Sequence, residues 1–235
     1  MKRTLNLIII FILLLPLNGN AEWKSGTVIS YEQIKRNGAN NYFEIMAIDD
    51  GLLQRMRKGG SLPTTSMIDH ESLRYLKVLH YNYSGEIQTG EIVCNKLIAD
   101  DLMSIFKELF RHKYQIQKIG LIDDYGANDE ASMKDGNSSA FCYRKVKGVK
   151  RLSKHAMGMA IDINPINNPC VKSGADGKVK SVQPDTVESH RHVRRSADVP
   201  HQIDKNDLCY KLFISHGFRW GGSWRSKKDY QHFEK

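Results

Sequence analysis

The strongest constraint on the fold lies in one short segment around Asp162. This acid stands between Ile161 and Ile163, so the alternation of a strand turns both isoleucines to one face and the carboxylate to the other. Burying a carboxylate costs free energy unless it binds something. Gly158 permits a turn that brings His155 back towards the acid. Both side chains are ligands that zinc accepts, and the plainer alternative is a solvated histidine with an edge-strand acid.

A second segment strengthens the zinc hypothesis. Asp229 and His232 stand three residues apart, after Trp220 and Trp224. His232 supplies a third ligand, and three protein ligands leave one zinc position for water, as in catalytic sites. Zinc lowers the pKa of a water molecule, and Asp229 is suited to take its proton during attack on a carbonyl.

Together these segments resemble the D-alanyl-D-alanine carboxypeptidase family of zinc peptidases. The shared pattern is Ser-x-His-x-x-Gly-x-Ala-x-Asp at 153–162 with Asp-x-x-His at 229–232, and the likeness covers roughly 73–235. Family members cleave bacterial cell-wall peptides, either as D-alanyl-D-alanine carboxypeptidases or as L-alanyl-D-glutamate endopeptidases. Trp-Gly-Gly-x-Trp at 220–224 and Asp-Tyr-Gln-His-Phe-Glu at 229–234 resemble the endopeptidase branch in particular.

The resemblance implies a role for each matching residue. It implies Zn²⁺ bound by His155, Asp162 and His232, with Asp229 as general base and acid. Arg144 matches the family arginine that points at the substrate carbonyl or the developing oxyanion. The alternative for Arg144 is an ordinary surface salt bridge.

Four further residues have two interpretations each. Ser153 either orients the metal ligands or touches substrate, or its hydroxyl stabilises a turn. Trp220 and Trp224 either wall the cleft or fill the core. Glu234 either supports the metal ligands or is an exposed acid.

One segment departs from the family pattern. Relatives often carry a Tyr-x-Asp-Arg-like element where this chain has His-Val-Arg-Arg at 192–195. The loss of that acid leaves substrate specificity open. For this histidine-rich segment we expect a solvated loop rather than a second metal site.

Helices and strands do not alternate regularly along the chain, which predicts an α+β fold with a small, mainly antiparallel sheet flanked by helices. The resemblance implies more specifically the LAS-type (Hedgehog/D,D-peptidase-like) zinc peptidase fold. We expect Asn95 to cap the helix that follows it, and we expect a long polar stretch over 165–202. The expected elements are a hairpin of strands 75–83 and 86–94, helices 45–56, 97–110 and 204–216, and strands 116–122, 141–146, 159–163, 218–220 and 230–233.

The N-terminus predicts export. A short positive start precedes an almost wholly apolar run at 5–17 and small residues at 19–21, as in a cleaved secretory signal peptide over 1–21. An uncleaved anchor is the alternative. We expect residues 22–72 to be an extension that packs on a peptidase domain at 73–235, and the protein to be periplasmic or secreted.

Charge and cysteine content narrow the partners. With 35 Lys and Arg against 26 Asp and Glu, the chain carries a formal charge of +9, which suits an anionic setting such as the cell wall. No aromatic-interleaved basic motif indicates nucleic acid, and no stable membrane span is expected after signal cleavage. Of the four cysteines, Cys170 and Cys209 bracket one irregular segment and are the preferred disulfide pair.

The sequence therefore predicts a zinc peptidase that hydrolyses peptidoglycan stem peptides. One alternative is a non-catalytic zinc-binding or wall-binding module on the same scaffold, which has no need of a base at Asp229. A thiol hydrolase that uses Cys142 with a nearby histidine is the other, and it lacks a local nucleophile motif.

Overall fold

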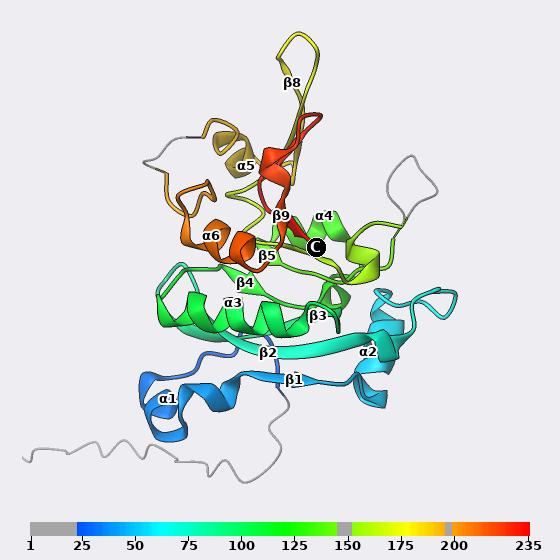
Figure 1. Ribbon diagram of the computed structural model, residues 1–235, viewed down its shortest axis with the longest axis vertical. Helices are drawn as coiled ribbons and strands as arrows, with labels where there is room; N and C mark the ends of the chain where they lie inside the picture. Colours follow the sequence, from blue (N-terminus) through cyan, green and yellow to red (C-terminus); the bar gives the residue numbers. More distant parts are fainter. Residues whose placement is uncertain (1–22, 145–151, 196–198) are drawn as a thin grey trace, which may run out of the picture.

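The computed structural model describes residues 23–144, 152–195 and 199–235. It has a mixed α and β architecture with small, mostly antiparallel sheets and helices, as the sequence predicts (Figure 1). The signal peptide expected over 1–21 lies outside the described residues. Within them, no helix combines the length and the apolar character that crossing a membrane requires.

The predicted hairpin forms the centre of the first sheet. Strands β2 (Leu73–Tyr81) and β3 (Ile87–Asn95) pair antiparallel over nine residues each. The apolar stripe of α3 (Ala99–Arg111) packs against β2 (Figure 1), so that helix is present as predicted. Asn95 does not cap it: the N-cap position is Ile98, and the Asn95 side chain accepts a hydrogen bond from the Leu97 backbone instead.

Both edges of this hairpin are covered by residues from the N-terminal region. On one side, β1 (Glu44–Met46) pairs with β2, and on the other, backbone hydrogen bonds join residues 26–29 to residues 87–89 of β3. The helix expected over 45–56 is therefore strand at its start, and α2 (Asp50–Gly59) begins only after Asp49, whose carboxylate caps it. The region also contains α1 (Tyr31–Asn37) and the 3-10 turns η1 (Ala39–Tyr42) and η2 (His70–Ser72).

A second sheet has the order β6-β11-β9, from Ala160–Asp162, His232–Glu234 and Arg219–Trp220. Its apolar face meets the core: Ile161 and Phe233 are fully buried, and the Phe233 ring stacks on Phe213 of α6 (Leu208–Ser215) at 4.2 Å between centroids. The two isoleucines that flank Asp162 share this face, as the alternation predicts. The sheet thus holds its polar side chains on the opposite face.

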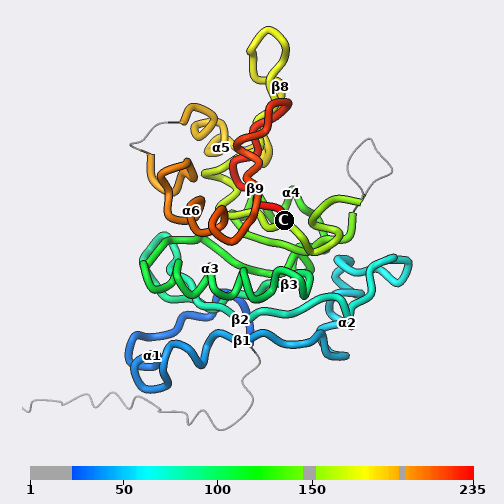
Figure 2. The backbone as a smooth tube through the Cα atoms, viewed as in Figure 1, coloured from blue at the N-terminus to red at the C-terminus, as the bar shows by residue number. Residues whose placement is uncertain are grey.

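The third sheet lies in the stretch expected to be polar and irregular. It has the order β10-β7-β8, from Lys228–Asp229, Cys170–Ser173 and Val179–Gln183. The β7–β8 hairpin extends from the body of the molecule, and the chain near residue 225 runs beside it (Figure 2). The short helix α5 (Val187–Arg191) follows β8.

The connection between the first sheet and the metal-ligand segment is mostly turns. Strands β4 (Lys118–Ile119) and β5 (Asn137–Ser138) pair parallel, with η3 (Ile122–Tyr125) and α4 (Asp129–Lys134) between them. The strand expected over 116–122 is thus reduced to two residues. No strand forms over 141–144, and residues 145–146 of that prediction lie outside the described part of the chain.

The predicted disulfide is wrong. All four cysteines are free thiols, because Cys209 faces the core from α6 with no exposed surface, whereas Cys170 lies on β7 opposite Asp229. The two residues bracket the irregular segment in sequence but belong to different layers of the molecule.

The histidine-rich segment is only in part the expected solvated loop, because His190, Arg191 and Arg194 are exposed but His192 and Arg195 are packed. His192 is buried, and both its ring nitrogens contact amides, those of Asn167 and Gln202. The Arg195 guanidinium donates to the Ile203 carbonyl and lies over the Tyr230 ring at 4.3 Å. These residues hold the loop together.

Candidate metal centre and active site

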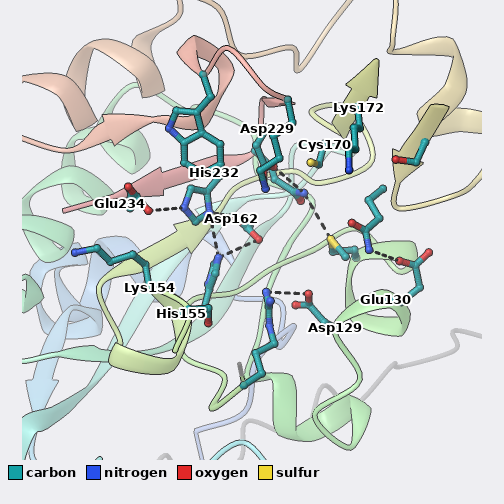
Figure 3. A pocket seen from close by; sticks show the side chains of 18 of the residues that line it. Asp129, Glu130, Lys154, His155, Asp162, Cys170, Lys172, Asp229, His232 and Glu234 are labelled. Atoms are coloured by element: carbon teal, nitrogen blue, oxygen red, sulfur yellow. Dashed lines mark hydrogen bonds and ion pairs between the residues drawn. The ribbon is translucent and has the colours of Figure 1, made fainter. Parts of the chain in front are cut away.

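The three predicted zinc ligands converge. His155 lies on the 3-10 turn η4 (His155–Met157), and the register of β11 on β6 sets His232 directly opposite Asp162. The His232 Nδ1 atom is 2.9 Å from Asp162 Oδ1 and 3.1 Å from His155 Nε2. His155 Nε2 is 3.3 Å from Asp162 Oδ2. Figure 3 shows the three side chains pointing towards one another.

The turn that carries His155 depends on its neighbours in sequence. The Ser153 hydroxyl accepts a hydrogen bond from the Ala156 backbone at 3.0 Å, which stabilises the start of the turn. Gly158 ends it in the left-handed region at φ +67°, and a Cβ there would lie 2.6 Å from the backbone nitrogen of Asn95. The sequence therefore needs glycine at 158, both for the turn and for the close approach to β3.

Hydrogen bonds orient both histidine rings. His155 Nδ1 lies 2.6 Å from the Ala140 carbonyl, so it carries the proton and leaves the Nε2 lone pair free. His232 Nε2 lies 3.3 Å from Glu234 Oε2, so Glu234 supports the other ligand ring. Partners of this kind fix ring orientation in metal sites.

The charges in the triad balance one another. Burial alone would raise the pKa of Asp162, but the two histidines beside it hold that pKa well below its usual range. Burial would lower the pKa of His232, but Asp162 and Glu234 outweigh burial and raise that pKa to about 10. A cation bound at this position takes the place of a proton, as metal ions do at their ligands.

The donor set fits zinc. Zn²⁺ with nitrogen and oxygen ligands at 2.0–2.1 Å in a tetrahedron has ligand–ligand separations of about 3.3 Å. The separations here are 3.1 Å between the two nitrogens, 2.9 Å from His232 to Asp162 Oδ1 and 3.3 Å from His155 to Asp162 Oδ2. One ligand atom from each residue lies within 4.8 Å of the other two. A zinc site of this kind requires two histidines and one carboxylate. The ring nitrogen of each histidine that faces away from the metal must also have a hydrogen-bond partner, as both do here.

A cleft of about 1150 Å³ opens beside the triad. Asp229 lies on its wall, 7% exposed, with Oδ2 held by the Lys227 ammonium at 2.9 Å. Gly221, in the Trp-Gly-Gly segment, packs so closely that a Cβ would lie 2.6 Å from the Asp229 carbonyl oxygen and 3.2 Å from the Cβ of His232. That segment therefore supports both residues of the Asp-x-x-His motif.

Arg144 also lines the cleft, and its partner is a residue that sequence reasoning missed. Its guanidinium pairs with Asp129 at 2.9 Å, at the start of α4. Burial raises the pKa of Asp129, although Arg144 opposes that shift. The acidic stretch at 123–136 was the available signal, but nothing in it distinguished Asp129 from its neighbours.

The structure separates the two tryptophans. Trp224 lines the cleft, with its ring 5.1 Å from the ring of His232. Trp220 instead packs in the core and donates its indole N–H to the Tyr230 carbonyl. Ser153 and Glu234 both lie at the cleft, where they contact the turn and the His232 ring respectively.

Cys142 has the surroundings of an inert thiol. It is 4% exposed, and burial raises its pKa to about 11, so the thiol stays protonated near neutral pH. The structure therefore offers no support for a thiol hydrolase.

Comparison with known proteins agrees with this geometry. A family model described as D-alanyl-D-alanine carboxypeptidase matches residues 147–235, the segment that contains the three candidate ligands and Asp229. The match supports a peptidase, and over residues 147–235 it confirms the resemblance to the D-alanyl-D-alanine carboxypeptidase family predicted from the sequence. Neither a curated protein nor a solved structure matches the chain.

Proposed function

We propose that this protein is a zinc-dependent peptidase that hydrolyses peptide bonds in peptidoglycan stem peptides. The observation that carries the proposal is the convergence of His155 Nε2, His232 Nδ1 and the Asp162 carboxylate within a metal-sized space, beside a cleft that Asp229 lines. In this proposal, residues 73–235 form the peptidase domain, with the LAS-type fold. The apolar run at 5–17 supports export to the periplasm or the medium, where such peptides occur.

Zinc, when bound by the triad, supplies Lewis acidity that polarises the scissile carbonyl and lowers the pKa of the attacking water. Asp229 takes the proton from that water and passes it to the leaving amine. Its buried position on the cleft wall and its ion pair with Lys227 hold the carboxylate in one place, as a base needs.

Arg144 stabilises negative charge on the scissile carbonyl oxygen. Its guanidinium is always charged, and the ion pair with Asp129 fixes it at the cleft before substrate arrives. Trp224 forms an apolar wall next to the His232 ring and limits the water around the reacting bond.

The decisive variant is Asp229→Asn, which keeps the shape of the side chain and removes the proton acceptor. We expect unchanged zinc content and folding, with turnover of muropeptides lowered by about 10²- to 10⁴-fold. The matched control is Asp185→Asn, the same change at an exposed acid of the same cleft that pairs with His190. Near-parental turnover by Asp229→Asn would remove Asp229 from the mechanism.

Mass spectrometry of defined muropeptides provides the measurement. Loss of one terminal D-alanine indicates a carboxypeptidase, and cleavage between L-alanine and D-glutamate indicates the endopeptidase branch that the 220–224 and 229–234 segments resemble. Stoichiometric zinc without cleavage of any stem peptide would instead establish the non-catalytic binding module.

A further inference from the structure

One wall of the cleft is a single face of the third sheet. The register of β10 on β7 sets Asp229 opposite Cys170, and both line the cleft. Two residues further along β7, Lys172 lies on the same face and also lines the cleft. Val171 between them is buried on the other face. Figure 3 shows Asp229, Cys170 and Lys172 following one another along this wall.

The next strand extends the same face with uncharged polar groups. Ser181 pairs with Lys172 and Gln183 pairs with Cys170, and both β8 residues line the cleft. Val182 between them is buried against Val171. Along β7 and β8, away from Asp229, the wall therefore carries a hydroxyl from Ser181 and a positive charge from Lys172.

A second lysine lies next to the strand that pairs with β7. Lys227 immediately precedes β10, in which Lys228 pairs with Val171, the neighbour of Lys172. Lys227 and Lys172 both line the cleft.

Lys172 is the cation of this cleft that has no partner among the described residues. The four other lysines and arginines that line the cleft each engage an acceptor. Arg144, Lys154, Arg219 and Lys227 contact, in that order, Asp129, the Lys235 carbonyl, Glu234 and Asp229. Lys172 is exposed to the cleft instead, and no ion pair or side-chain hydrogen bond joins it to another described residue.

We propose that Lys172 binds a carboxylate of the substrate. The proposal rests on the function proposed above and specifies its substrate class: an acidic peptide. Two strand residues span about 6.6 Å, so the backbone of Lys172 lies roughly that far along the wall from the row of Asp229. In this proposal the carboxylate belongs to a substrate residue near the scissile amide. Lys172 is thus a specificity residue, distinct from the residues that perform hydrolysis.

The test compares two stem peptides that differ only in charge, one with free side-chain and α-carboxylates and one with these groups amidated. For Lys172→Met we expect kcat/KM on the acidic peptide to fall about tenfold, mainly through KM, and kcat/KM on the amidated peptide to stay unchanged. A tenfold loss corresponds to about 1.4 kcal/mol, the size of one charge-assisted hydrogen bond. The preference for the acidic peptide should also weaken as ionic strength rises.

The matched control is Lys180→Met. Lys180 lies on the same hairpin, and its replacement removes the same charge. Side chains alternate along β8, so Lys180 points to the face of Val182 and not to the face of Ser181. Among the described residues, Lys180 does not line the cleft. We expect both peptides to be cleaved by this variant at the parental rate. An equal loss on the acidic and amidated peptides in Lys172→Met, or an equal loss in Lys180→Met, would overturn the proposal.

Binding separates this inference from the proposed function. Calorimetry with Asp229→Asn, which turns over slowly in our proposal, measures affinity for the acidic and the amidated peptide directly. If the parental protein cleaves neither peptide, the proposed function fails. Tighter binding of the acidic peptide that disappears on adding Lys172→Met would still support the carboxylate site. Equal affinity of Asp229→Asn for both peptides refutes it.

Discussion

Replacing Gly158 by alanine would test whether the turn under His155 is built for the metal site. Two effects add at this position. The residue has φ +67°, which costs an L residue about 1–2 kcal/mol. The new Cβ would also lie 2.6 Å from the Asn95 backbone nitrogen, which must move, and this nitrogen donates a 2.8 Å hydrogen bond to the Gly158 carbonyl.

The magnitude follows from comparing two glycines. Weakening that hydrogen bond adds about 1 kcal/mol, so Gly158→Ala should lower the free energy of unfolding by about 2–3 kcal/mol. Gly126 has φ +60° with no atom within 4 Å of an added Cβ, so Gly126→Ala carries only the backbone cost of about 1–2 kcal/mol. The difference between the variants isolates the contact with β3.

Urea unfolding in the presence of a chelator gives both free energies, and competition with a zinc indicator gives the metal affinity. We expect Gly158→Ala to weaken zinc binding at least tenfold, because the turn must shift and carries His155 with it, a loss within the range seen for groups that orient metal ligands. Gly126→Ala should bind zinc like the parent. Equal stability and equal zinc affinity in the two variants would refute the argument.

Three further outcomes are expected. His155→Ala and His232→Ala should each lose zinc in metal analysis, whereas Glu234→Gln should retain the site with about 10- to 100-fold weaker affinity by indicator competition. Glu91→Gln should lower the free energy of unfolding by about 1–3 kcal/mol at pH 7. Glu91 is a buried acid of β3 that accepts hydrogen bonds from Arg55 at 2.6 Å and from the Tyr75 hydroxyl at 2.7 Å. Burial alone would raise the pKa of Glu91, but these partners lower it, so its stabilisation is present above its ordinary pKa of 4.5. The gap between parent and Glu91→Gln in urea titrations should therefore shrink as pH falls from about 7 to 3. Cys142→Ala should leave muropeptide turnover unchanged, since this thiol is buried and protonated.

Periodicity predicted the elements that bury one continuous apolar face. The β2–β3 hairpin and the helices α3 and α6 are of this kind, and their apolar residues alternate or recur at helical spacing. The β7–β8 hairpin was missed for the opposite reason. Only Val171 and Val182 are buried in these two strands, and two apolar residues in a polar stretch do not establish the alternation that predicts a strand.

The candidate ligands were predictable because their spacing follows from chemistry and local turns. The partner of Arg144 was not predictable. Asp129 reaches Arg144 only because separate parts of the chain meet at the cleft, and such a pairing depends on tertiary structure. The charged residues of 192–195 misled for the same reason, since the Arg195 guanidinium finds carbonyl and ring partners inside the fold.

The coverage of the central hairpin has a consequence for how this chain avoids self-association. A strand edge with free N–H and C=O groups is a template for pairing with another copy. Here β1 pairs with residues 75–77 of β2, and residues 26–29 pair with residues 87–89 of β3, so the N-terminal region protects part of each outer edge. A protein cut before Leu73 would expose both of these stretches at once. We expect such a fragment to form aggregates, however intact its ligand residues are.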